Sequence, residues 1–235
     1  MLGNFKREKS ILLSSYPKSG NTWLKFILSH LYAKKGTSIS FKMIEEIAPG
    51  VMPMWKFLLK KKYLYPAVFK SHSPYHLSNN NFKNIYLIRD PRDVYLSYYY
   101  FLSGAKDLTH FSWFIANYEF PYGRWSEHVR SWIQHRNEDN IAIVKYEDLL
   151  VNIHHELDRI VDKLSLPSTK RERNEAVEKC TFNNLKKMAS TAGNNYFFRK
   201  GTSSQWVNTY SNDARDQFCK FEDTGLLQEL DYPPF

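Results

Sequence analysis

The sequence is poor in cysteine and has neither a long apolar run nor an N-glycosylation sequon. Its 235 residues include two cysteines, Cys180 and Cys219, too few for a disulfide framework and too far apart for a zinc knuckle. The first apolar run, Ile11–Leu13, is much shorter than a signal-peptide core or the roughly 20 residues that span a bilayer. We therefore expect a cytoplasmic protein with no membrane span.

The chain carries an excess of positive charge that no single tail contains. Lys and Arg total 33 against 24 Asp and Glu, which gives a formal net charge of +9. This charge predicts an anionic partner without saying which one. Because 43% of the residues are hydrophobic, the chain can build a core without disulfides or metals, and we expect one domain over residues 1–235.

Short apolar runs alternate with segments of helical periodicity. The runs predict buried strands at Ile11–Ser14, Ala67–Lys70, Asn84–Arg89 and Ile141–Tyr146. A helix after the first strand would be capped by Asn21 or Thr22, and another would run from Asp90-Pro91 to about Phe101. This alternation predicts an α/β fold, a three-layer α/β/α domain with a central parallel sheet. From about Val151 onward the sequence predicts helices and loops, with Pro167 breaking one helix.

The first motif lies between the first predicted strand and its helix. Residues 15–23 read Ser-Tyr-Pro-Lys-Ser-Gly-Asn-Thr-Trp. A polar turn before a helix presents backbone N–H groups and the positive end of the helix dipole to an anion, and Lys18 adds a full charge. The motif therefore predicts a phosphate-binding turn. It departs from the Walker A pattern because the lysine precedes the only glycine, which indicates an anion other than Mg²⁺-bound β- and γ-phosphates.

The second motif, Phe-Lys-Ser-His at 69–72, ends the second predicted strand. At the carboxyl edge of a parallel sheet His72, with Lys70 beside it, can act as a general base near neutral pH. The other histidines have no comparable position and are interpreted as structural: His30, His76, His110, His128, His135, His154 and His155. No pair has a metal-binding spacing with a third ligand, so we predict no catalytic metal.

Two further segments are rich in cations and hydroxyls. Arg89 leaves the third predicted strand, and Ser97 follows two helical turns later, so both can bind a phosphate. The alternative for Arg89 is an ion pair with Asp90 or Asp93. We expect Arg92 and Asp93 to form surface or helix-end charge pairs. Residues 197–206, Phe-Phe-Arg-Lys-Gly-Thr-Ser-Ser-Gln-Trp, form either a loop that closes over a phosphate or a solvated loop.

Together these motifs resemble the cytosolic-type sulfotransferases that use 3′-phosphoadenosine 5′-phosphosulfate (PAPS). Residues 16–23 look like that family's 5′-phosphosulfate loop, and Lys70-Ser71-His72 is similar to its Lys-Thr-His segment. The spacing from Arg89 to Ser97 and the Arg199-Lys200-Gly201 run match its 3′-phosphate site. Tyr146-Glu147-Asp148 and Thr181-Phe182 resemble the segments beside the adenine. The resemblance covers residues 11–208 and implies a P-loop-NTPase-like sulfotransferase fold whose helical C-terminal part closes over the nucleotide.

The resemblance also implies roles for single residues. His72 would take the proton of the acceptor, while Lys18 and Lys70 neutralise the charge that grows on the departing phosphate. The 5′-phosphosulfate would be held by Lys18, Ser19, Gly20, Asn21 and Thr22. The 3′-phosphate would be held by Arg89, Ser97, Arg199, Lys200 and Gly201. The purine would be held by Trp23, Tyr146, Thr181 and Phe182. The product would be adenosine 3′,5′-bisphosphate (PAP), and no metal is implied.

Some features depart from the family pattern. Ser204 replaces the second glycine of the C-terminal loop, Val207 replaces its lysine, and the family's dimer segment is hard to find at 207–216. The oligomeric state therefore stays open. The chain is shorter than the animal members, which predicts trimmed loops around the acceptor and a bacterial source.

The sequence leaves two other functions open. A P-loop kinase would need Mg²⁺ and an acidic residue at a strand end, a pattern that Asp90 meets only loosely. A basic protein that binds polyanions would use the +9 charge and the lysine-rich residues 56–62, which could instead be a solvated helix face or a lid. For a sulfotransferase, the many aromatic residues predict a small-molecule acceptor, which could be an alcohol, phenol, amine or saccharide, with no nucleic acid as partner.

Overall fold

The computed structural model describes residues 10–33, 39–40, 43–44, 66–104, 107–191 and 201–235. Three features predicted from the sequence lie outside these residues: the lysine-rich 56–62 segment, Arg199 and Lys200. Within the described ranges no helix combines the length and apolar character that a membrane crossing requires.

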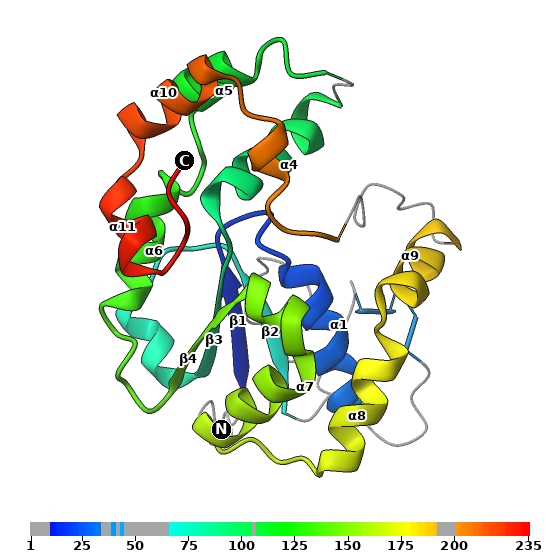
Figure 1. The fold of residues 1–235 in the computed structure, drawn as a ribbon. Helices are drawn as coiled ribbons and strands as arrows, with labels where there is room; N and C mark the ends of the chain where they lie inside the picture. The colour runs from blue at the N-terminus through cyan, green and yellow to red at the C-terminus, as the bar shows by residue number, and fades with distance from the viewer. Residues whose placement is uncertain (1–9, 34–38, 41–42, 45–65, 105–106, 192–200) are drawn as a thin grey trace, which may run out of the picture.

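A parallel four-stranded sheet forms the centre of the molecule (Figure 1). Its order is β2-β1-β3-β4, where β1 is Ile11–Ser15, β2 is Val68–Ser71, β3 is Lys83–Ile88 and β4 is Ile141–Lys145. In the register of the sheet, Ile11 pairs with both Val68 and Lys83, and Asn84 pairs with Ile141. All four predicted strands are confirmed. They could be predicted because continuous apolar runs are typical of strands buried on both faces.

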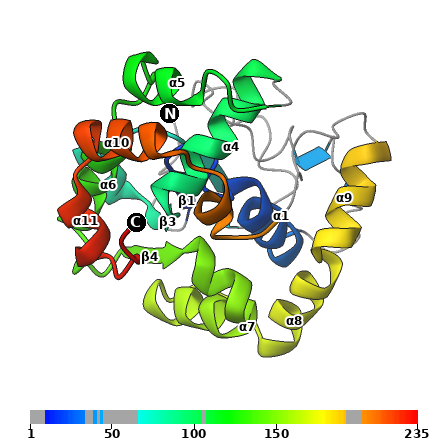
Figure 2. The ribbon, with the colours of Figure 1, turned by 45° about the horizontal axis from the view of Figure 1, so that its top comes forward.

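Alternate residues of the strands face two separate cores. Ile11 and Leu13 point toward a cluster with α1 (Asn21–Leu31), α7 (Tyr146–Lys163), α8 (Lys170–Lys179) and α9 (Phe182–Thr191). Tyr86 and Ile88 point toward a second cluster with α4 (Pro91–Ser103), α5 (Phe111–Asn117), α6 (Trp125–Ile133), α10 (Asn212–Phe221) and α11 (Thr224–Glu229). Figure 2 shows these two sets of helices on opposite sides of the strands. The predicted three-layer α/β/α architecture is confirmed.

Two short 3₁₀ segments complete the described elements. The segment η2 spans Leu77–Asn81 and η3 spans Gln205–Asn208. Pro167 lies between α7 and α8, as predicted. The helical part begins earlier than predicted, since α7 starts at Tyr146 rather than near Val151.

The prediction that Asn21 or Thr22 caps α1 is wrong. The N-cap residue is Gly20 in a left-handed conformation, with no capping side chain. The Asn21 amide points back to the sheet and donates to the Ser15 hydroxyl at 2.9 Å. The first N–H groups of α1 are therefore not covered by a capping side chain, which favours an anion at this helix end.

The predicted start of α4 is confirmed, but the charges that follow it are not at the surface. Asp90 caps the helix by accepting from the Arg92 N–H at 2.9 Å, and Pro91 is the first helical residue. Arg92 and Asp93 are almost fully buried, so of the two expected alternatives the helix-end pairs are confirmed and the surface pairs are wrong. Their charges are instead matched inside the protein: Arg92 pairs with Asp90 at 2.7 Å, and Asp93 lies 3.7 Å from Arg89.

Candidate functional site

A cavity of about 850 Å³ lies where the carboxyl ends of β1, β2 and β3 meet the N-terminus of α1. In a parallel sheet this edge collects the loops that lead into helices, which is the common location of ligands. Most of the predicted site residues line this one cavity: Lys18, Gly20, Asn21, Thr22, Trp23, Lys70, His72, Arg89, Ser97, Tyr146, Phe182 and Gly201. The fold thus brings together residues from six separate parts of the sequence.

Two predicted residues lie beside the cavity without lining it. Ser19 is fully buried in the turn before α1. Thr181 is exposed, and its hydroxyl accepts from the Asn184 N–H at 3.4 Å at the start of α9. In the described structure Thr181 therefore bonds a helix end, whereas Ser19 faces the interior of the turn.

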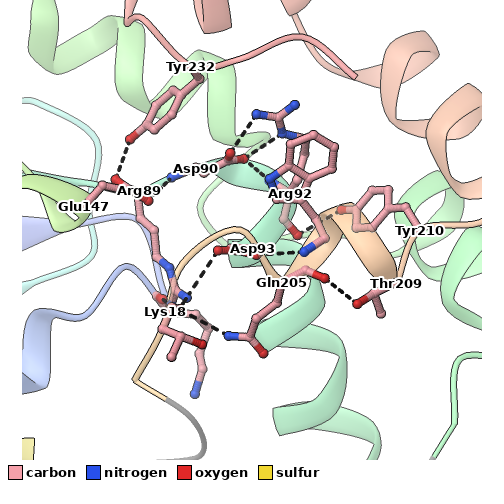
Figure 3. A network of polar contacts seen from close by, with 12 residues as sticks. Lys18, Arg89, Asp90, Arg92, Asp93, Glu147, Gln205, Thr209, Tyr210 and Tyr232 are labelled. Atoms are coloured by element: carbon pink, nitrogen blue, oxygen red, sulfur yellow. Dashed lines mark hydrogen bonds and ion pairs between the residues drawn. The ribbon is translucent and has the colours of Figure 1, made fainter. Parts of the chain in front are cut away.

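Arg89 joins three segments that surround one end of the cavity (Figure 3). Its guanidinium donates to the carbonyl oxygens of Lys18 at 3.2 Å and Thr202 at 3.0 Å. The guanidinium carbon also lies 4.4 Å from the centre of the Tyr146 ring, close enough for a cation–π interaction. Arg89 therefore holds the turn after β1, the loop before η3 and the start of α7 at fixed distances from one another.

Asp93 carries this connection to the C-terminal part of the chain. Its carboxylate accepts from the Trp206 N–H at 3.1 Å, and the Arg92 guanidinium carbon lies 3.6 Å from the centre of the Trp206 ring. Burial raises the pKa of Asp93, whereas the nearby Arg89 lowers it. These two contacts to Trp206 hold the start of η3 against α4, and they also restrict the position of the adjacent residues 201–205.

Two glycines leave no room for a side chain around the cavity. A Cβ atom on Gly20 would lie 2.5 Å from the Tyr146 ring, and one on Gly201 would lie 2.4 Å from the Phe182 ring. Gly20 also has a φ of +95°, which L residues rarely adopt. Glycine at both positions lets the main chain pack directly against an aromatic ring.

The polar atoms of the site fit a nucleotide with two phosphate groups. Within the described residues, Arg89 lines the cavity and its Nε is buried without a hydrogen-bond partner. Buried polar atoms normally have a partner, so this N–H is a candidate donor to a ligand oxygen. Lys18 points along the same wall, with Nζ 3.9 Å from the centre of the Phe101 ring. An anion at the α1 N-terminus and another near Arg89 would satisfy this arrangement.

The His72 ring is fixed in one tautomer by the end of β1. Its Nδ1 lies 2.8 Å from the carbonyl oxygen of Ser15. A carbonyl oxygen only accepts, so Nδ1 carries the proton and Nε2 carries a lone pair in the neutral ring. Because His72 lines the cavity, Nε2 is the ring atom available to take a proton there.

The surroundings of His72 keep the ring neutral. Burial lowers its pKa to about 4, and the neighbouring positive charge of Lys70 acts in the same direction. The hydrogen bond to Ser15 opposes this shift but is the smaller effect. At neutral pH the imidazole is therefore uncharged, the state that a general base requires.

Aromatic residues of α4 and Tyr122 line the cavity together with His72. The Tyr122 ring centre lies 5.9 Å from that of His72, and the end of α4 contributes Tyr98, Tyr100 and Phe101. They are among the many aromatic residues from which the sequence predicts a small-molecule acceptor. The sequence analysis did not single out Leu150, Leu185 and Gln205, which also line the cavity. The first two lie four residues after Tyr146 and three after Phe182, a helical spacing that could have indicated them.

The fold and this site define an α/β protein whose cavity combines cationic side chains, a helix N-terminus and a neutral histidine. Residues 8–228 match the model of the sulfotransferase domain. Sulfotransferase 2A6 of Rattus norvegicus is 31% identical over 91% of this chain and 83% of its own length. A 3-beta-hydroxysteroid sulfotransferase of Cavia porcellus is 28% identical over 97% of this chain and 86% of its own. The chain belongs to the sulfotransferase family.

A solved structure supports the fold. Mouse sulfotransferase SULT7A1, solved in complex with PAP, superposes with a TM-score of 0.71 at 23% identity, over 95% of this chain and 89% of that one. The predicted enzyme class, a PAPS-dependent sulfotransferase, is confirmed, which decides against the kinase and polyanion-binding alternatives. Asp90, the acidic residue considered for a kinase, forms an ion pair with Arg92 at 2.7 Å. Among the described residues no three His, Cys, Asp or Glu side chains group as metal ligands.

Proposed function

We propose that the enzyme transfers a sulfuryl group from PAPS to a hydroxyl group of a small molecule, with His72 as the general base. The observation that carries this proposal is the bond from His72 Nδ1 to the Ser15 carbonyl, which leaves Nε2 unprotonated in the cavity. When bound, PAPS supplies the activated sulfur. As the acceptor oxygen bonds to sulfur, the bond from sulfur to the 5′-phosphate oxygen breaks, and the acceptor proton passes to His72 Nε2.

The residues around the α1 N-terminus would stabilise the charge that develops in this step. The leaving phosphate gains negative charge, and the backbone N–H groups of residues 20–22 together with Lys18 lie where the cavity meets the helix. Lys70 lines the same cavity two residues before His72. Cations and N–H groups that are already in place stabilise such charge without reorganising. Lys18 and Lys70 therefore complete the proposed catalytic set.

The remaining lining residues are proposed to hold the nucleotide. Arg89 precedes α4 and Ser97 lies two turns further along, inside the helix; both line the cavity with Gly201 and would bind the 3′-phosphate. Arg199 and Lys200 stay predictions from the sequence motif. The Trp23 and Tyr146 rings meet edge to face at 6.1 Å, and together with Phe182 they line the part of the cavity proposed for the purine. Thr181 remains a proposed neighbour of that part.

The acceptor is proposed to be an apolar molecule that carries a hydroxyl group. Support comes from the aromatic residues Tyr98, Tyr100, Phe101 and Tyr122 in the cavity lining, of which Tyr122 lies beside His72. The charged residues among the described lining are all cationic, Lys18, Lys70 and Arg89, which disfavours a protonated amine. Of the classes left open by the sequence, alcohols and phenols fit this lining better than amines.

A single set of assays tests the base and the acceptor together. His72→Gln should lower kcat by about 10²- to 10⁴-fold, the usual contribution of a general base, while the Kd of PAP stays unchanged. The matched acceptors 4-ethylphenol and tyramine, which differ by an ammonium group, should show a lower KM for 4-ethylphenol. Near-normal turnover in His72→Gln would remove His72 from the reaction, and a preference for tyramine would contradict the acceptor class.

The cytoplasmic location and the bacterial source stay predictions. Both cysteines are free thiols in the structure, Cys180 buried and Cys219 exposed, as is common in a reducing compartment. Cell fractionation with an antibody to the chain would test the location.

A further inference from the structure

The loop after β2 carries His72 but has no regular secondary structure of its own through residue 76. Its backbone is bound by one face of α6. His128 Nε2 lies 2.9 Å from the His72 carbonyl oxygen, Trp132 Nε1 donates to the Ser73 carbonyl at 3.3 Å, and the Tyr75 N–H donates to Ser131 Oγ at 3.0 Å. Residues 128, 131 and 132 share a helix face because they are three and four positions apart.

The His128 ring is held from its other side as well. The Tyr86 hydroxyl lies 2.8 Å from His128 Nδ1, and the Tyr16 ring meets the imidazole edge to face at 5.3 Å. Only 1% of His128 is exposed. The Tyr86 ring is itself stacked on Trp132 at 4.7 Å. These contacts leave the imidazole little freedom to turn.

The partners of His128 also fix where its proton lies. The His72 carbonyl oxygen only accepts, so His128 Nε2 carries the proton and Nδ1 accepts from the Tyr86 hydroxyl. The bonds therefore run in one direction, from Tyr86 to His128 to the His72 backbone, and from the His72 ring to Ser15. In the opposite tautomer, the Nε2 lone pair would face the lone pairs of the His72 carbonyl oxygen.

We propose that His128 is a positioning residue for the His72 base, acting through its hydrogen bond to the His72 carbonyl oxygen. The proposal rests on the proposed role of His72. The Ser15 bond fixes which nitrogen of the His72 ring carries the proton, and the His128 bond fixes the main chain from which that ring projects. Because a displacement of about 1 Å can cost on the order of 10²-fold in rate, this main-chain bond matters to turnover.

The first test reads the tautomers in the unaltered protein. Long-range ¹H–¹⁵N NMR spectra at pH 7 should show His128 with its proton on Nε2 and His72 with its proton on Nδ1. Either histidine in the opposite tautomer would overturn the proposal. This measurement does not depend on a variant that folds.

The second test compares two amides at position 128. The amide nitrogen of Gln lies near the place of His Nε2, whereas that of Asn lies near Nδ1. His128→Gln should therefore keep most of kcat, and His128→Asn should lose kcat on the order of 10²-fold. The Kd of PAP should be the same in both. His30→Gln, a half-buried histidine of α1 outside the cavity lining, serves as the control and should turn over normally.

The outcomes separate this inference from the proposed function. Normal kcat in His128→Asn, or equal losses of kcat and PAP binding in both amide variants, would overturn the positioning role. If His128→Asn does not fold, Tyr86→Phe takes its place, since it removes the donor to Nδ1 and should lower kcat with PAP binding unchanged. If His72→Gln is active, the proposed role of His72 as general base is wrong. If His72→Gln is inactive while His128→Asn is fully active, only the positioning role of His128 is wrong.

Discussion

At the scale of single residues, burial sets the charge state of the groups that would do the chemistry. His72 and His128 lie 56 positions apart in the sequence, yet the ring of one touches the main chain of the other. Burial lowers the pKa of each to about 4. For a histidine a lowered pKa means that the neutral form persists in mildly acidic solution, where a free imidazole, with a pKa of about 6.5, is protonated.

The pH dependence of catalysis follows from this shift. Because His72 binds a proton only near pH 4, kcat/KM should stay level from pH 7 down to about pH 5 and fall below it. The profile should be measured with 4-ethylphenol, together with tryptophan fluorescence to restrict it to pH values at which the protein is folded. An acidic limb centred near pH 6.5 would contradict the assignment of a desolvated histidine as base.

Gly20 offers a second test at the residue scale. Gly20→Ala should weaken PAP binding and destabilise the fold by about 1–3 kcal/mol, because its Cβ would lie 2.5 Å from Tyr146 at a φ of +95°. Gly104→Ala is the matched control, since its φ is also positive at +60° but its Cβ would meet nothing within 4 Å. Urea unfolding and a PAP titration of both variants measure the difference. Equal effects at the two positions would mean that backbone strain alone accounts for the loss.

At the scale of secondary-structure elements, two helix caps carry ion pairs in very different surroundings. Asp90 caps α4 and pairs with the fully buried Arg92. Asp223 caps α11 and pairs with Arg130, whose side chain is 43% exposed. Removing one member of a buried pair leaves a buried charge without compensation, whereas water replaces a lost partner at the surface.

This contrast predicts unequal losses of stability. Asp90→Ala should lower the free energy of unfolding by about 3–5 kcal/mol, and Asp223→Ala by about 1 kcal/mol through its lost cap. Urea denaturation at pH 7 measures both. Similar losses in the two variants would show that the Arg92 charge is not buried in solution.

The elements also show what the sequence could predict. The strands were found because each is a continuous apolar run, and the start of α4 because Asp90 and Pro91 are local signals. The α1 cap was missed because the Asn21 side chain bonds Ser15 in the sheet instead of its own helix. The α6 face that binds the His72 loop had no sequence signature, since His128 and Trp132 bond carbonyl oxygens that every residue possesses. Tertiary contacts to backbone atoms leave no pattern in composition or spacing.

At the scale of the whole molecule, hydrogen bonds connect the C-terminal part of the chain to its middle part, beside the edge of the sheet. Tyr232 donates to Glu147 at 3.1 Å, and Glu147 also accepts from the Asp90 N–H. Glu222 in turn accepts from Tyr95 and from the Ser126 N–H, and burial raises its pKa. These bonds join α10 and the residues after α11 to α4, α6 and α7.

Such cross-connections predict that the chain unfolds as one unit. We expect a single thermal transition, with near- and far-ultraviolet circular dichroism changing together and PAP raising its midpoint. Two separate transitions, with the C-terminal helices melting first, would contradict the single domain over 1–235 that we propose.

The pairing of the central sheet has a consequence for how the protein reaches its native state. Each strand pair joins residues more than 50 positions apart, as in Ile11 with Val68 and Asn84 with Ile141, and the described sheet contains no hairpin. The chain loses conformational entropy when such long loops close, and it does so before the contacts between paired strands can stabilise it. Refolding should therefore be slow for a chain of this size, and the half-assembled sheet, with its apolar strands uncovered on both faces, is the species most prone to aggregate.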